Sequence, residues 1–180
     1  MMRLSLTVSV MAAALCLARQ AFDTYCLTRT RLSVPPGLPP AFQARSGVFV
    51  SAMVHGAPRC CMGALYPTQP TLAEEIIAAA SAAAGLDARF RAIRPDELSR
   101  LRLIVSVVGP PEAVSDVATV DPVTEGIAAR WHDRIGVVLP GETRDRVRAA
   151  RWACRRAGVP AGARPEYFRV RAVRMMEAQP

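Results

Sequence analysis

The segment over residues 47–65 constrains the fold most, because it predicts two strands joined by a very short turn. Residues 47–54 and 59–65 are mostly apolar and lie on either side of His55-Gly56. Glycine enters the left-handed backbone region that a two-residue turn requires, so the two strands must run antiparallel. Pro58 has no amide hydrogen for a sheet ladder, which predicts that the returning strand begins at a sheet edge or at a bulge.

Helix signals follow this hairpin and alternate with further strand signals. Thr71 and Glu74 are spaced as a capping box, which predicts the start of a helix, and Gly85 marks its expected end. We also expect a helical turn at residues 95–98, a strand at 101–108, a weak signal at 113–123, a hairpin at 126–130 and 135–139, a helix at 143–157 and a last strand at 168–173. Hairpins separated by helices, without a regular βαβ rhythm, predict an α+β fold: an antiparallel sheet of hairpins with flanking helices.

The N-terminal segment, residues 1–30, is apolar and has two interpretations. Apolar residues recur at steps of three and four from residue 4 to residue 25, which predicts an amphipathic helix. A secretory signal peptide also begins with a basic residue and an apolar run, but the helical pattern continues past the cleavage point that Ala12-Ala13-Ala14 would offer. We therefore expect a first helix docked on the core rather than a signal peptide, and the apolar run is too short to span a membrane.

The composition predicts a packed globular protein, with 51% hydrophobic and 21% charged residues in a chain of 180 residues, enough for one domain. The formal net charge of +8 comes from arginine alone, because the sequence contains no lysine. Basic charge raises affinity for phosphate backbones. The arginines are nevertheless spread along the chain, aromatic residues make up only 6%, and no helix-turn-helix or RNP-like pattern occurs. We therefore do not expect nucleic acid as a partner.

The cysteines indicate free thiols in a reducing cytoplasm. An odd number cannot all pair, and their spacing matches neither a secreted disulfide framework nor a metal-binding or redox motif. The five are Cys16, Cys26, Cys60, Cys61 and Cys154. The sequence also lacks a serine triad, a phosphate-binding glycine loop, a dinucleotide fingerprint and a zinc-protease motif. We expect no metal site, and nothing indicates a cofactor.

Four motifs, taken in order, resemble one known family. They are "GVFVSAMVHGAPRCCMGAL" at residues 47–65, "LAEEIIAAASAAAGLDARF" at 72–90, "DELSRLRLIVSVVGPPEAV" at 96–114 and "CRRAGVP" at 154–160. Together they resemble the AMMECR domain family, which includes protein A of the bacterial AmmeMemoRadiSam system. The resemblance implies a single domain over residues 1–180, or two interwoven subdomains. Cys60 stands where the family usually has glycine, which marks this chain as a divergent member.

The signature strand carries the candidate nucleophile. Neighbouring residues on a strand point to opposite faces, so Cys60 and Cys61 cannot easily share a metal ion. The resemblance places Cys61 at the family's motif cysteine. Positive charge favours the thiolate, and we expect that charge from Arg59 and from the amide end of the helix after Thr71. The alternative is that Cys61 only fills the core, as buried cysteines commonly do.

Other candidates surround this cysteine. Glu74 is expected to cap its helix, which leaves Glu75 to face a cleft or solvent as a third catalytic candidate. Gly63 and the pair formed by Asp87 and Arg89 match family positions, which makes them substrate-binding candidates. Asp87 and Arg89 have a second interpretation as an ion pair that stabilises a turn. The remaining assignments are turn positions for His55 and His132 and a core position for Phe90.

The family has no settled activity, so whether this chain is an enzyme stays open. Two functions remain, and a third, nucleic-acid regulation, rests on charge alone. The first is a cysteine-dependent enzyme, or a component of a modification system with Memo-like and radical S-adenosylmethionine proteins, acting through Cys61. The second is a non-catalytic module that binds a partner protein in a groove beside the same hairpin.

Overall fold

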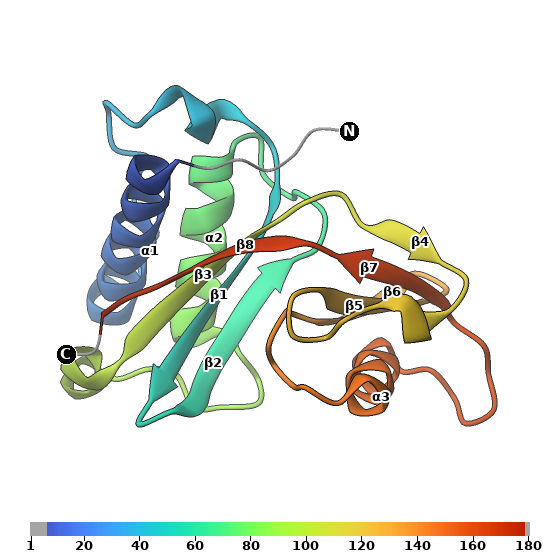
Figure 1. Cartoon of the computed structure of the whole chain (residues 1–180). Coiled ribbons are helices and arrows are strands. Elements are labelled where there is room, and N and C mark those ends of the chain that lie inside the picture. Colours follow the sequence, from blue (N-terminus) through green and yellow to red (C-terminus); the bar gives the residue numbers. More distant parts are fainter. Residues whose placement is uncertain (1–6, 179–180) are drawn as a thin grey trace. The chain divides into compact units, whose positions relative to one another are not determined.

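The computed structural model of this protein describes residues 7–178, which form two compact units (Figure 1). Of the described residues, the first unit contains 7–108 and also 173–178. The second unit comprises Gly109–Ala172. The chain therefore leaves the first unit once and returns to it near its end.

The first unit is a four-stranded sheet with two long helices packed together. Its elements are α1 (Val8–Thr28), the 3-10 helix η1 (Pro40–Gln43), β1 (Gly47–Val54), β2 (Ala57–Ala64), α2 (Leu72–Gly85), the 3-10 helix η2 (Pro95–Arg100), β3 (Arg102–Val108) and β8 (Ala172–Met176). The strand order is β2-β1-β3-β8, and β1 runs antiparallel to both of its neighbours. The predicted hairpin, α2 and β3 are confirmed, and so is the α+β class.

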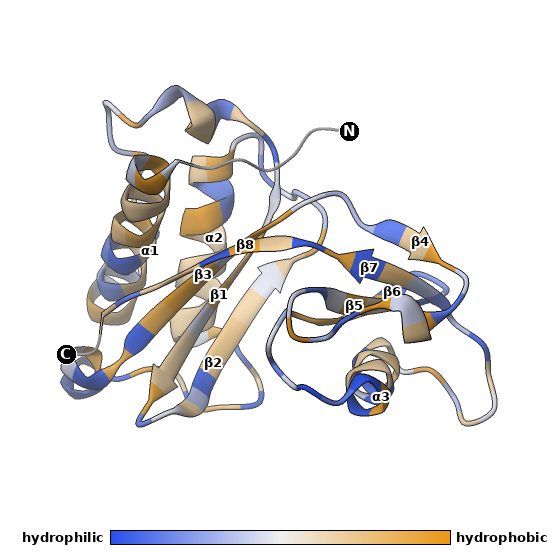
Figure 2. Cartoon of the chain, in the orientation of Figure 1, coloured by the Kyte–Doolittle hydropathy of each residue, from blue (hydrophilic) through white to orange (hydrophobic). Residues whose placement is uncertain are grey.

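The core of the first unit lies between the helices and one face of the sheet. Along β1, the alternate residues Val48, Val50 and Ala52 are fully buried, and Ile76 of α2 and Phe22 of α1 join them in the same cluster. Figure 2 shows that β3 is mostly hydrophobic as well. Strand alternation thus assigns this face to the core and leaves the other face for the remaining side chains.

The first helix begins and ends at capping residues. The Thr7 side chain accepts a hydrogen bond from the amide of Val10, and Arg29 takes the left-handed conformation that ends the helix. The predicted docked helix is confirmed from Val8 onward, while the start of its pattern at residues 4–6 lies outside the described residues. Among residues 7–178, no helix combines the length and apolar character needed to cross a membrane.

The second unit is another four-stranded sheet, with the order β4-β7-β5-β6, covered by one helix. Its elements are β4 (Glu112–Val114), the 3-10 helix η3 (Val117–Thr119), β5 (Gly126–Trp131), β6 (Arg134–Val138), α3 (Arg146–Ala157) and β7 (Glu166–Val170). The helix packs closely on β6, because a Cβ atom added at Gly136 would lie 2.1 Å from the carbonyl oxygen of Ala153. The predicted second hairpin is confirmed, with His132 in its turn at φ 54°.

The C-terminal strand differs from the prediction. The alternating pattern at residues 168–173 indicated one strand, but the structure divides this stretch between β7 in the second sheet and β8 in the first. The break falls at Arg171, whose carbonyl accepts a hydrogen bond from the amide of Gly109. Alternation reports that a strand has one buried face, and it does not report which sheet the strand joins.

Candidate functional site

A bulge in β2 decides which cysteine faces the core. The turn at His55 and Gly56 has positive φ at both residues, so on its own it would align Ser51 with Cys60. Instead the register shifts by one residue at Arg59, and Ser51 lies opposite Cys61. The bulge and edge position that Pro58 predicted are therefore confirmed, because β2 is also the outermost strand of its sheet.

The two neighbouring cysteines consequently have different environments. Cys60 lies opposite Ala52 in the core and is 1% exposed, and this burial raises the pKa of its thiol to about 12. Cys61 is only partly buried and lies on the opposite face, across from Ser51. The expectation that they point to opposite faces is confirmed. Ser51 was not among the predicted residues, since its proximity to Cys61 depends on the bulge.

The backbone of Cys61 is held from the outer edge of β2 by Asp87 and Arg89. The Cys61 amide donates a 2.9 Å hydrogen bond to Asp87 Oδ2, and Nη2 of Arg89 donates one of 2.9 Å to the Cys61 carbonyl. The two side chains also form an ion pair, with Nη2 and Oδ2 2.8 Å apart. This ion pair supplies one acceptor and one donor, as a neighbouring strand would, and we call it the edge clasp.

The edge clasp is partly buried and electrically neutral. Asp87 is 6% exposed, and burial alone would raise its pKa. Hydrogen bonds from the Arg89 side chain, the Cys61 amide and the Arg89 amide outweigh that effect and lower the pKa of Asp87. The predicted turn-stabilising ion pair is therefore confirmed, and it reaches further than the turn because it fixes the candidate nucleophile's backbone.

Arg59 forms an ion pair with Glu97. Its guanidinium donates to both carboxylate oxygens of Glu97, at 2.8 and 3.0 Å, and to the carbonyl of Arg91 at 2.8 Å. These hydrogen bonds from Arg59 also lower the pKa of Glu97. The positive charge of Arg59 is thus balanced by Glu97, and the pair ties the bulge of β2 to the segment that runs along its edge.

Glu75 differs from expectation, whereas the start of α2 agrees with it. Glu75 was predicted to face a cleft or solvent, but it is 2% exposed, and its carboxylate accepts hydrogen bonds from the amides of Thr68 and Gln69 at 2.6 and 2.7 Å. The Thr71 side chain accepts a hydrogen bond from the Glu74 amide, as the capping box predicted. Thr68 and Gln69 lie in the loop before α2, which gives the Glu75 carboxylate a structural role.

Gly63 and Phe90 have local explanations of their own. Gly63 has φ +155°, and a Cβ atom there would lie 2.1 Å from the Val48 carbonyl oxygen and 2.5 Å from the Phe49 Cα, so the close approach of β1 and β2 requires glycine. Phe90 was predicted to be a core residue, but it is 36% exposed. The Arg89 guanidinium lies 5.6 Å from the centre of its ring, so an exposed aromatic side chain stands beside the edge clasp.

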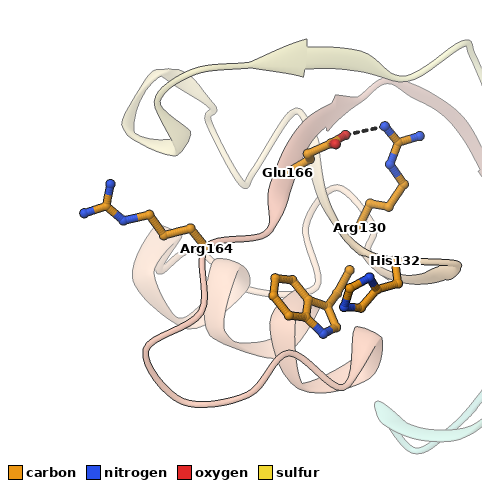
Figure 3. A pocket seen from close by; sticks show the side chains of 5 residues that line it. Arg130, His132, Arg164 and Glu166 are labelled. Carbon is orange, nitrogen blue, oxygen red and sulfur yellow. Dashed lines mark hydrogen bonds and ion pairs between the residues drawn. The ribbon is translucent and has the colours of Figure 1, made fainter.

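A separate cavity of about 250 Å³ lies in the second unit, lined by Arg130, Trp131, His132, Arg164 and Glu166. Arg130 and Glu166 form an ion pair across β5 and β7, and the Trp131 and His132 rings meet edge to face at 4.6 Å (Figure 3). Arg164 points away from that pair. Among residues 7–178, the cavity included, no cluster of three or more His, Cys, Asp or Glu side chains is arranged to hold a metal ion.

Comparisons with known proteins identify one family and several similar proteins. The family model described as AMMECR1 matches residues 15–175. A protein of Thermotoga maritima is 40% identical over 109 residues, and one of Methanothermobacter thermautotrophicus is 40% identical over 96 residues. These alignments cover 60% and 53% of this chain, and 61% and 50% of the two relatives, so the matched part spans little more than half of their length. The crystal structure of the uncharacterised protein PH0010 from Pyrococcus horikoshii is similar, with a TM-score of 0.89, 25% identity, and coverage of 97% of this chain and 95% of that one.

Proposed function

The chain belongs to the AMMECR1 family, and from this premise we propose that it acts through the thiol of Cys61, as a cysteine-dependent enzyme or as a component of a modification system. One observation carries the proposal: the partly buried Cys61 has both of its backbone hydrogen-bonding groups fixed by the edge clasp, while its neighbour Cys60 is sealed in the core. Residues that must place a reacting atom are typically held by such supporting contacts.

The proposed chemistry is nucleophilic attack by the Cys61 sulfur on an electrophilic carbon of the substrate. The Cys61 thiol first gives its proton to water. The resulting thiolate sulfur forms a new bond to that carbon, and the leaving group departs with the bonding electron pair. In this proposal Asp87 and Arg89 position the strand. Cys60 takes no part, since its raised pKa keeps that thiol protonated at neutral pH.

The location and partners form the finer part of the proposal. Cys16, Cys26, Cys60 and Cys154 are free thiols, which supports a reducing cytoplasm as the place of action. Memo-like and radical S-adenosylmethionine proteins are the partners that membership of the family suggests. A thiol-bearing protein could pass a modified group to, or accept one from, such enzymes.

The test is limited alkylation of the native protein with iodoacetamide at neutral pH, followed by mass-spectrometric mapping of each cysteine. Cys16 is exposed on α1 and serves as an ordinary thiol within the same chain, and Cys60 serves as the buried reference. We expect Cys61 to be alkylated faster than Cys16. Cys16 is more exposed, so a higher rate at Cys61 would reflect the reactivity of its thiol rather than its exposure. Alkylation of Cys61 no faster than that of Cys60 would overturn the proposal.

A second function, a non-catalytic binding module, is favoured by the exposed Phe90 ring beside Arg89. Aromatic and arginine side chains contribute strongly to protein interfaces, and here they are stacked next to the same hairpin. The variants Phe90→Ala and Cys61→Ser distinguish the two functions. A binding module loses its partner only in the first variant, whereas a thiol-dependent reaction is abolished by the second.

A further inference from the structure

The helix α3 presents arginine on the side opposite to its buried face. Its buried residues Ala149, Ala153 and Ala157 follow a four-residue step and pack on β5 and β6. Arg148, Arg151 and Arg155 are exposed. At about 100° per residue, these three arginines lie within roughly 60° of one another and about 165° from the centre of the alanine row. We call them the arginine row, and Figure 2 shows hydrophilic residues on α3.

The arginine row has little acidic compensation. No acidic residue occurs within Arg146–Ala157, and Asp145 at the N-cap lies 3.9 Å from the Arg148 guanidinium. Among the described residues, neither Arg151 nor Arg155 has an ion pair. Like charges three and four residues apart destabilise a helix, so the row carries an energetic cost that an anionic partner would offset.

We propose that the arginine row is a binding surface for the phosphate backbone of double-stranded nucleic acid, without selection for base sequence. The row extends about 10 Å along the helix, which is long enough to meet successive phosphates. Guanidinium groups bind phosphate oxygens in pairs, and they remain charged at every physiological pH. The arginines are spread along the sequence, which indicated a dispersed charge. Folding of α3 nevertheless places these three on one exposed face.

Charge and burial favour nucleic acid over an anionic membrane. A helix that lies in a membrane surface inserts its apolar face among the lipids. The apolar face of α3 is already buried by Ala149, Ala153 and Ala157 against the sheet. The outward face exposes one aliphatic side chain, Val147, beside the arginine row. It therefore offers charge with little apolar surface to insert, which suits a backbone of phosphates in water.

The test uses the full chain and a fluorescent DNA duplex of about 20 base pairs of mixed sequence, with binding followed by anisotropy between about 50 and 200 mM salt. One variant replaces Arg148, Arg151 and Arg155 by glutamine, which keeps helix propensity. The matched control replaces three exposed arginines of the first unit, Arg31, Arg45 and Arg91, by glutamine. Both variants remove three positive charges, and circular dichroism confirms that each is folded.

Three phosphate contacts predict a slope of log affinity against log salt of about −2.7, which is roughly a 40-fold loss between 50 and 200 mM salt. In the row variant, we expect the slope to become less negative by about 2.7 and the affinity at the lower salt to fall at least about tenfold. In the control variant, we expect the affinity to change by less than about threefold. Equal losses in both variants, or no binding by the wild type at low salt, would overturn the proposal. So would row-dependent binding to phosphatidylserine vesicles without binding to the duplex.

Discussion

The amide of Cys61 donates a 2.9 Å hydrogen bond to a carboxylate oxygen of Asp87, a residue 26 positions further along the chain. Asp87 is almost fully buried, and Arg89 completes the edge clasp on the Cys61 carbonyl. One ion pair thus closes the exposed edge of β2 and fixes the residue proposed to react. The stability of this edge and the reactivity of Cys61 should therefore depend on the same carboxylate.

Replacing Asp87 by asparagine tests that dependence. The variant keeps the size of the side chain but removes a charged acceptor shared by Cys61 and Arg89, so we expect a loss of about 2–3 kcal/mol in the free energy of unfolding. Urea denaturation measures it. Asp96→Asn is the control, because its ion pair with Arg94 is largely exposed and should change stability by less than about 0.5 kcal/mol. Similar values for both variants would contradict the importance of the edge clasp.

The edge clasp and the ion pair between Arg59 and Glu97 should also make the free energy of unfolding depend on pH. The pKa values of Asp87 and Glu97 are lowered in the folded protein, so each contributes stability above its unfolded pKa, about 3.9 for aspartate and 4.3 for glutamate. That contribution disappears as the pH falls through the lower, folded pKa values. We expect the free energy of unfolding to fall between about pH 5 and pH 2, and to fall less steeply in the Asp87→Asn, Glu97→Gln double variant.

The local signals in the sequence predicted much of the fold. The bounds of β1 and α2 agree with the prediction at both ends, because a turn, a capping threonine and a terminal glycine lie within a few residues of each boundary. The prediction of a single last strand was wrong, because the structure divides this stretch between two sheets. The choice of sheet depends on partners far away in the chain. Short β4 falls where the signal was weak.

The sequence predicted several residues of the candidate site, but it did not predict most of the contacts between them. Asp87 and Arg89 were paired correctly, but their hold on the Cys61 backbone depends on how the segment after α2 returns to the edge of β2. The place of Ser51 opposite Cys61 depends on one bulged residue, Arg59, which reverses the parity of the strand. Helical position could not show that Glu75 turns back to the loop at Thr68, because loop conformation has no periodic signal.

Gly63 offers a test of the close approach between the strands of the hairpin. We expect Gly63→Ala to lose about 2–4 kcal/mol in the free energy of unfolding, because the added methyl group would overlap backbone atoms of Val48 and Phe49. Gly37→Ala separates overlap from backbone conformation, since Gly37 has φ +76° and nothing within 4 Å of an added Cβ. That control should cost only about 1–2 kcal/mol. Thermal or urea unfolding gives both values, and an equal cost would show that crowding is not the cause.

Glu75 distinguishes a structural carboxylate from a catalytic one. Glu75→Gln replaces the charged acceptor of the Thr68 and Gln69 amides with a neutral amide group, and we expect a loss of about 1.5–3 kcal/mol in the free energy of unfolding. Because these contacts lie in the loop before α2, the alkylation rate of Cys61 in the folded variant should stay within about twofold of the wild-type rate. Mass-spectrometric mapping measures that rate under conditions where the variant remains folded. A large fall in Cys61 reactivity with unchanged stability would instead assign Glu75 to the chemistry, as its sequence position first suggested.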